Sequence, residues 1–167
     1  MGDIVIRAYE SKDEQAIWHC IEKLQEHLVS VDRWNAERIP ANDFGRRYVA
    51  DLLKQIAKEE GRIFVAESEG KVVGFIAGII RRFMEDDASC LAPSINGRIL
   101  ELFVEEGFRG QKIGRRLMEA MEEYFKEKGC RLVRVEAFAP NGVARQFYED
   151  KCGYEEWLVD YVKELET

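Results

Sequence analysis

The N-terminal part of the chain opens with a short β-branched run and continues into a helical repeat. Residues 4–7 (Ile-Val-Ile-Arg) favour a β-strand. Apolar side chains then recur at helical spacing and predict an amphipathic helix over residues 12–29. These side chains are Ile17, Ile21, Leu24 and Leu28. The preceding Ser11-Lys-Asp-Glu14 matches a capping box, in which each side chain accepts a hydrogen bond from the other residue's backbone N–H.

The middle of the chain predicts a second helix and then a β-hairpin. The helix ends near Gly61, and its apolar positions are Tyr48, Val49, Leu52, Leu53 and Ile56. Two apolar runs at residues 62–66 and 71–80 flank the turn pair Glu69-Gly70, which is typical of a hairpin. Residues 84–97 contain acidic residues, Pro and Asn-Gly, and predict a loop or a second turn.

Strands and helices alternate again towards the C-terminus. We expect a strand at residues 98–104, a long helix with an apolar stripe from Ile113 to Phe125 and its end at Gly129, a strand at 132–138, a short helix at 143–150 and one or two closing strands at 157–165. The order is then β-α-α-β-β-β-α-β-α-β-β, without a domain-sized linker or a repeat. This pattern predicts one mixed-sheet α/β domain over residues 1–167.

Composition and charge exclude several classes of protein. Of the 167 residues, 46% are apolar and 34% are charged, which fits a folded domain rather than a disordered chain. The net charge of −7 argues against a nucleic-acid partner. No apolar run approaches the roughly 20 residues that a membrane helix needs, so no membrane partner is expected. The N-terminus shows no secretory signal, and we expect a cytoplasmic protein.

The cysteines and histidines do not form a metal-binding pattern. The cysteines are dispersed and contain no C-x-x-C pair, which predicts reduced thiols rather than a zinc site. They are Cys20, Cys90, Cys130 and Cys152. The two histidines, His19 and His27, fall within one amphipathic segment and are interpreted as helix residues rather than ligands. No bound metal is expected.

A candidate anion site lies where the strand at residues 100–104 leads into a helix. The connection from Arg109 to Gly114 (Arg-Gly-Gln-Lys-Ile-Gly) presents unpaired backbone N–H groups at the positive end of the helix dipole. Four basic residues add positive charge here: Arg109, Lys112, Arg115 and Arg116. The alternative interpretation is an ordinary strand-to-helix connection. No G-x-x-x-x-G-K-[S/T] loop is present, and no G-x-G-x-x-G follows the first strand.

A second motif runs from Asn141 through Ala144 and Phe147-Tyr148 to Gly153-Tyr154. Together with the first motif it resembles the GNAT superfamily of N-acetyltransferases. Members of that superfamily bind the pyrophosphate of acetyl-CoA through [R/Q]-x-x-G-x-[G/A] and carry N-x-x-A-x-x-[F/L]-Y downstream. In this chain Lys112 replaces the first glycine of the loop and brings an ammonium group to the pyrophosphate. The resemblance covers the chain from Ile4 to Leu165. It implies a mostly antiparallel central sheet flanked by helices, with acetyl-CoA as cosubstrate.

The resemblance also implies roles for individual residues. The pantetheine amides of the cofactor would pair with strand backbone around Leu102, Phe103 and Val104, and the Val104 N–H would face the thioester carbonyl oxygen. Tyr148 would protonate the leaving thiolate, or else it is only a core aromatic. Asn141 would cap its helix, contact the cofactor, or do both. The complete cofactor-binding set is Leu102, Phe103, Val104, Arg109, Gly110, Gln111, Lys112, Ile113, Gly114, Arg115, Asn141, Ala144 and Tyr148.

Glu101 is the candidate general base. A carboxylate in the middle of a central strand is unfavourable unless it faces a cleft or has a partner. Strand alternation places its side chain on one face together with Ile99 and Phe103. Glu101 would accept the proton of an incoming ammonium through water, or it forms a salt bridge, for instance to Arg134. Glu136 is a weaker candidate for the same role.

These residues predict an acetyl-CoA-dependent N-acetyltransferase that transfers the acetyl group directly to a primary amine. The alternatives are a non-catalytic acyl-CoA-binding module and a nucleotide-phosphate protein outside the superfamily. Cys130 and Cys152 have no histidine near them in the sequence, which argues against a thiol intermediate.

The acceptor and the assembly are predicted only in general terms. The acidic balance of the chain favours a cationic acceptor, such as a polyamine, an aminoglycoside, or a lysine or N-terminal amine. Many members of the superfamily pair through C-terminal elements, and the apolar residues between Trp157 and Val162 supply an exposed edge. A homodimer is therefore expected.

Overall fold

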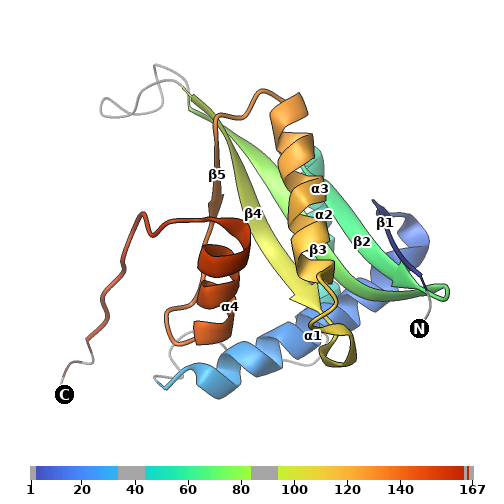
Figure 1. The fold of residues 1–167 in the computed structure, drawn as a ribbon, viewed down its shortest axis with the longest axis horizontal. Coiled ribbons are helices and arrows are strands. Elements are labelled where there is room, and N and C mark those ends of the chain that lie inside the picture. The colour runs from blue at the N-terminus through green and yellow to red at the C-terminus, as the bar shows by residue number, and fades with distance from the viewer. Residues whose placement is uncertain (1–2, 34–43, 84–93, 164, 166–167) are drawn as a thin grey trace.

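The computed structural model describes residues 3–33, 44–83, 94–163 and 165, and its centre is a five-stranded mixed sheet (Figure 1). The strands lie in the order β1-β2-β3-β4-β5, and only β4 and β5 run parallel. Their bounds are β1 Ile4–Ala8, β2 Arg62–Ser68, β3 Lys71–Phe83, β4 Ser94–Val104 and β5 Leu132–Val135. The predicted fold class, a mixed and mostly antiparallel sheet flanked by helices, is confirmed.

Helices cover both faces of this sheet. The α-helices are α1 Glu14–Val31, α2 Phe44–Lys58, α3 Ile113–Glu127 and α4 Gly142–Gln146, and the shorter turns are η1 Ser11–Asp13, η2 Glu106–Phe108 and the π-helix η3 Phe147–Lys151. Helix α3 lies across one face of the sheet, and α1 and α2 lie on the other (Figure 1). Each face buries its own apolar cluster because strand side chains alternate between the two faces.

Two glycines let α3 approach the sheet closely. A Cβ on Gly97 of β4 would lie 2.4 Å from the Phe125 ring, and a Cβ on Gly78 of β3 would lie 2.7 Å from it. Phe125 is fully buried in the space that these two glycines leave open. Residues 94–97 were predicted as part of a loop, but they belong to β4, where Gly97 pairs with Ile80. The Asn96-Gly97 sequence, which is typical of a turn, here leaves space beside the strand for the Phe125 ring.

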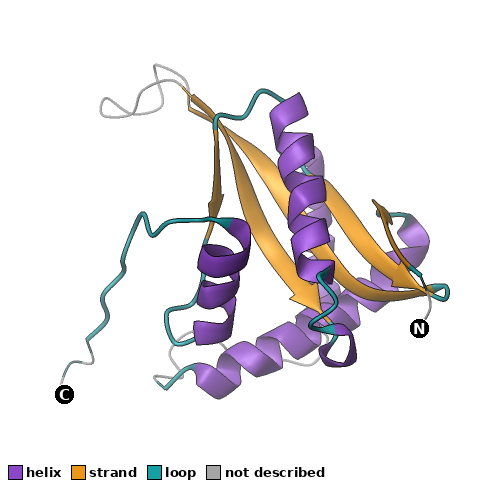
Figure 2. Cartoon of the chain, in the orientation of Figure 1, coloured by secondary structure: helices purple, strands orange, loops and turns teal. Residues whose placement is uncertain are grey.

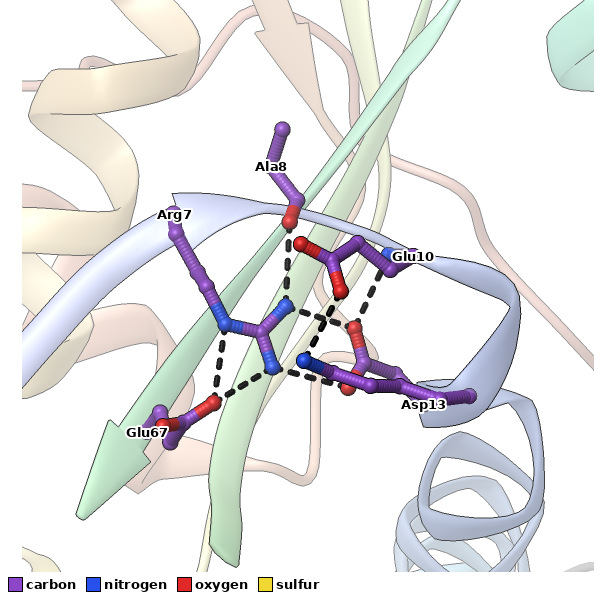
Figure 3. A network of polar contacts seen from close by, with 6 residues as sticks. Arg7, Ala8, Glu10, Asp13 and Glu67 are labelled. Carbon is purple, nitrogen blue, oxygen red and sulfur yellow. Dashed lines mark hydrogen bonds and ion pairs between the residues drawn. The ribbon is translucent and has the colours of Figure 1, made fainter. Parts of the chain in front are cut away.

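A polar network joins β1, β2 and the start of α1 (Figure 3). The Arg7 guanidinium donates to both carboxylate oxygens of Asp13, at 2.7 and 2.8 Å, and to Glu67 at 2.5 and 2.8 Å. Asp13 also accepts from the Glu10 backbone N–H at 2.9 Å and completes a capping box between these two residues. The prediction of a box between Ser11 and Glu14 is therefore wrong by one residue, because Arg7 holds Asp13 at the capping position.

The C-terminal part departs most from the prediction. β5 ends at Val135 rather than at residue 138. No strand forms in the described part of the segment 157–165, which leaves the body of the molecule as an extended loop (Figure 2). A strand needs a neighbour to pair its backbone, and the described residues supply none for this segment. The predicted loop at 84–93 lies outside the described residues.

Candidate active site

A bulge in β4 shapes the candidate site. Ala77 of β3 pairs with Glu101 and Gly78 pairs with Ile99, so Leu100 is an extra residue without a partner on β3. The bulge reverses the alternation of side chains, and Ile99 packs in the cluster beneath α3 whereas Phe103 packs beneath α1 and α2. The prediction that Ile99 shares a face with Glu101 and Phe103 is therefore wrong.

β4 and β5 separate just beyond the bulge. Their parallel pairing ends at Ile99 and Val135, so no described strand pairs with residues 100–104 of β4 on that side. The predicted pantetheine-binding residues Leu102, Phe103 and Val104 lie along this unpaired stretch. The backbone of Leu102 and the N–H of Val104 face this open side and can bond an extended amide-bearing ligand as an added strand would. The side chain of Phe103 is buried and its backbone pairs with Phe75 of β3, so the backbones of Leu102 and Val104 are the ones that face the open side.

A cavity of about 520 Å³ opens at the point where the strands separate. Helices α1 and α2 form one side, and β4, β5 and the segment that leads into η3 form the other. Of the predicted site residues, the structure brings Glu101, Leu102, Asn141, Ala144 and Tyr148 together around it. Sequence positions more than 40 residues apart therefore share one cavity.

Glu101 is bonded to a residue that the sequence analysis assigned only to an apolar helix face. The hydroxyl of Tyr48 on α2 donates to the Glu101 carboxylate. Arg134, the alternative partner, instead places its guanidinium over the Trp157 ring, 5.5 Å from the centroid. The other candidate base, Glu136, accepts from Arg98 at 2.7 Å and is 80% exposed. Glu101 is thus the carboxylate held inside the site.

Tyr148 lies on the π-helix and lines the same cavity. Insertions of this kind into a helix are frequent at functional sites. Burial raises the pKa of its hydroxyl above the ordinary value, and the charges of Cys152 and Glu101 raise it further. Its ring also packs edge-on against Phe147 and Tyr154. Tyr148 is therefore a protonated phenol that faces the cavity, and it packs with its neighbours as well.

The loop from Arg109 to Gly114 contains two residues in the left-handed region of backbone conformation. Gly110 has φ +80°, and Lys112, the N-cap of α3, has φ +60° in the left-handed region. The Arg109 side chain donates to the Val104 carbonyl at 3.0 Å and ties the loop to the end of β4. Lys112 forms no ion pair with any described residue, whereas Arg115 bonds Glu119 at 2.9 Å.

Other residues of the loop and of the second motif pack in the core or cap a helix. Ile113, the first residue of α3, is buried in the core against the sheet, so only its backbone N–H is available to a ligand. Gly114 leaves room for the Phe147 ring, which would lie 3.2 Å from a Cβ at that position. Asn141 caps α4 by accepting a hydrogen bond from the Ala144 N–H at 3.2 Å. The predicted capping role of Asn141 is therefore confirmed.

The described cysteines are not activated nucleophiles. Burial raises the pKa of the Cys20 thiol to about 12 and that of Cys152 to about 11, and it also raises the pKa of Cys130. All three are therefore thiols near neutral pH. No group of three or more metal-ligating side chains occurs among the described residues. Within the same residues, no helix is both long and apolar enough to span a membrane.

Comparison with known proteins agrees with this geometry. Residues 22–154 match the acetyltransferase (GNAT) family, and the chain belongs to that family. It is 34% identical over 113 residues to a Methanocaldococcus jannaschii protein named as an uncharacterized N-acetyltransferase. That alignment covers 68% of this chain and 46% of the relative, so the chain matches less than half of the relative's length. The prediction from the two motifs is confirmed at the level of the family.

Solved structures share the fold at low sequence identity. A mutant of the BH1408 protein from Bacillus halodurans superposes with a TM-score of 0.82 at 18% identity, over 96% of this chain and 99% of that one. The aminoglycoside acetyltransferase AAC(6')-Iy, in complex with a CoA-containing bisubstrate analogue, superposes with a TM-score of 0.67 at 19% identity. That superposition covers 98% of this chain and 99% of the other.

Proposed function

We propose that this protein transfers the acetyl group of acetyl-CoA directly to a primary amine. The observation that carries the proposal is the separation of β4 from β5 beside the N-terminus of α3, with Glu101 and Tyr148 on the same cavity. The backbone of Leu102 and the Val104 N–H, on the side that β5 leaves open, fit the pantetheine amides. The loop around Gly110 and the Lys112 ammonium fit the diphosphate at the helix start. The family membership supports the same activity.

The proposed chemistry uses one base and one acid. Glu101 removes a proton from the substrate ammonium, directly or through water, and the amine nitrogen attacks the thioester carbonyl carbon. A C–N bond forms while the N–H of Val104 faces the carbonyl oxygen on which negative charge develops. The C–S bond then breaks, the sulfur takes a proton from the Tyr148 hydroxyl, and the nitrogen loses its second proton to solvent. Solvent restores both side chains, so the net release is one proton.

The Gly110 backbone offers a test of the cofactor site. A β-branched residue is strained at φ +80°, so Gly110→Val should raise the Kd for CoA at least tenfold without unfolding the protein. Gly107→Val is the matched control, because Gly107 has no positive φ and open space around its Cβ position. Unchanged affinity in folded Gly110→Val, measured by calorimetric titration, would remove this loop from the cofactor site.

The same preparation separates an enzyme from a binding module. Incubation with acetyl-CoA and a mixture of primary amines should release free CoA thiol and give acetylated amines by mass spectrometry. CoA binding without any acetylated product would support the non-catalytic acyl-CoA-binding module instead. The three described cysteines are free, as a reducing cytoplasm would keep them, and we place the activity there.

We also propose that the protein forms a homodimer through its C-terminal segment. Six large apolar side chains after η3 are 61–89% exposed: Trp157, Leu158, Val159, Tyr161, Val162 and Leu165. The outer edge of β5 has no neighbouring strand among the described residues, and a strand edge of this kind pairs readily with another chain. Light scattering at micromolar concentration should give a dimer mass, and Leu158→Asp should weaken the dimer. A monomer mass for the unaltered protein would contradict this proposal.

A further inference from the structure

The cavity has an apolar wall on its helical side. Along α1, three apolar side chains that line it are spaced three and four residues apart, with Gln25 lining the cavity between the last two, and α2 adds an aromatic ring. We define this apolar wall by its members, Ile21, Leu24, Leu28 and Phe44. The ring of Phe44 lies 5.6 Å from that of Tyr48, which bonds Glu101. The apolar wall therefore begins next to the carboxylate proposed as the base and extends away from it along α1.

The charged groups of the cavity are few. Among the described lining residues they are Glu101, Glu136 and Arg98, and the last two form an ion pair at 2.7 Å. Because Glu136 is already paired with Arg98, it offers no separate charge to a second substrate ammonium. A second ammonium that lies against the apolar wall would be a cation without a charged partner, which is strongly disfavoured.

The direction from which the acceptor approaches follows from the position of β4, along which we place the cofactor. The reacting nitrogen must reach the unpaired part of β4, close to Glu101 and Tyr148, and so the rest of the acceptor extends towards α1. From these placements we propose that the acceptor is a primary monoamine with an apolar body, which lies between the apolar wall and β4. This inference rests on the proposed acetyl transfer and narrows its substrate class. It replaces the polyamine or aminoglycoside that the acidic composition favours.

A homologous series of acceptors tests the apolar wall. Initial rates of CoA release are measured with n-alkylamines from ethylamine to hexylamine. Each methylene buried against the apolar wall should raise kcat/KM by about threefold to fourfold. Hexylamine should also exceed 1,5-diaminopentane at least tenfold, although the diamine has nearly the same length and offers two reacting nitrogens. Equal rates along the series, or a preference for the diamine, would overturn the inference while acetyl transfer itself stands.

A matched pair of variants on α1 sharpens the test. Leu28 lines the cavity and is half-buried, whereas its neighbour Val29 is half-buried but does not line it. Leu28→Glu should lower kcat/KM for hexylamine and reverse the preference towards the diamine, while Val29→Glu should leave the preference unchanged. Calorimetric titration with CoA confirms that both variants are folded. If Leu28→Glu keeps the wild-type preference, the apolar wall does not contact the acceptor and the inference is wrong.

The two failures can be told apart. If the protein binds CoA and yields no product with any amine, the proposed acetyl transfer fails and the inference fails with it. If acetylated products form but polyamines or aminoglycosides are used at least as well as hexylamine, only the inference fails.

Discussion

Strand β4 has two different neighbours, and the difference separates the scaffold of this protein from its reactive part. On one side β4 pairs with β3 from Ser94 to Val104, and α3 covers the strands with a buried face. On the other side its pairing with β5 ends at Ile99, and neither α4 nor the π-helix contains a fully buried residue. Yet this lightly packed side carries three predicted site residues, Asn141, Ala144 and Tyr148.

The comparison explains how the site combines precision with access. The well-packed side fixes the backbone of β4, along which we place the cofactor. The lightly packed side leaves an open edge where a ligand or a second copy can add contacts. A ligand that binds the folded state stabilises it by mass action. Bound CoA should therefore stabilise the lightly packed side, which it would contact, more than the well-packed side.

The largest expected effect is a loss of activity from a substitution on the lightly packed side of β4. Tyr148→Phe keeps the ring and removes the hydroxyl, so kcat should fall by about 10²–10⁴, the usual contribution of a positioned acid. The free energy of unfolding should fall by at most about 1–2 kcal/mol. Because burial and Glu101 raise the pKa of Tyr148, activity should not be lost through its ionisation below about pH 10. Steady-state kinetics, denaturant titration and a pH–rate profile measure these three effects.

Tyr154→Phe is the matched control for this change. The Tyr154 hydroxyl donates to Glu122 at 2.9 Å, and its ring lies 6.1 Å from that of Tyr148, but Tyr154 does not line the cavity. Its loss should reduce stability and leave kcat within a small factor of the wild-type value. Near-normal turnover in folded Tyr148→Phe would refute the acid role and make Tyr148 a packing residue.

A single methyl group added on the well-packed side of β4 should reduce the stability of the protein. Gly97→Ala places a Cβ 2.4 Å from the buried Phe125 ring, which cannot move without displacing α3. Overpacking of this kind should reduce the free energy of unfolding by about 1–3 kcal/mol. Gly107→Ala, with open space at its Cβ position, should change it by less than about 0.5 kcal/mol. Denaturant titration of both variants provides the comparison, and equal stabilities would show that the close approach of α3 is not rigid.

The Arg7 network should make part of the scaffold's stability depend on pH. The Arg7 guanidinium holds the pKa of Asp13 below its ordinary value. The stabilisation is therefore present above the unfolded-state pKa of about 4 and is lost as the pH falls through the lower pKa of the folded state. Asp13→Asn should reduce the free energy of unfolding by about 1–2 kcal/mol at pH 7 and by less at pH 2. A loss that is equal at both pH values would contradict this account.

On both sides of β4, the sequence predicts best the features that depend on local contacts. Helices α1 and α3 and the β2–β3 hairpin follow from local periodicity and turn residues, because each buries one face against the sheet. The loop from Arg109 to Gly114 and the Asn141 cap were also found, since both depend on residues close together in the chain. Local patterns are sufficient where local contacts decide the structure.

Features that depend on distant partners were missed. The bulge at Leu100 arises from the register between β3 and β4, and no pattern within β4 marks it. The bond between Tyr48 and Glu101 joins residues 53 positions apart, and Tyr48 fitted an apolar helix stripe equally well. One signal was available: a tyrosine hydroxyl that becomes buried requires a partner. The alternating apolar residues after Trp157 look like a strand, but a strand forms only beside a neighbour.

The smallest effect is expected at Lys112, where the two sides of the molecule meet at the start of α3. A lysine at φ +60° is strained, and glycine removes that strain but loses more conformational entropy on folding. Lys112→Gly should therefore raise the free energy of unfolding by less than about 1 kcal/mol. Lys112→Ala keeps the strain and removes the ammonium, so the pair of variants separates backbone from charge. Both should weaken CoA binding severalfold at low salt, and added salt should diminish the difference from wild type, since exposed charges are screened. If Lys112→Gly weakens CoA binding and Lys112→Ala does not, the left-handed lysine supports the loop through its backbone alone.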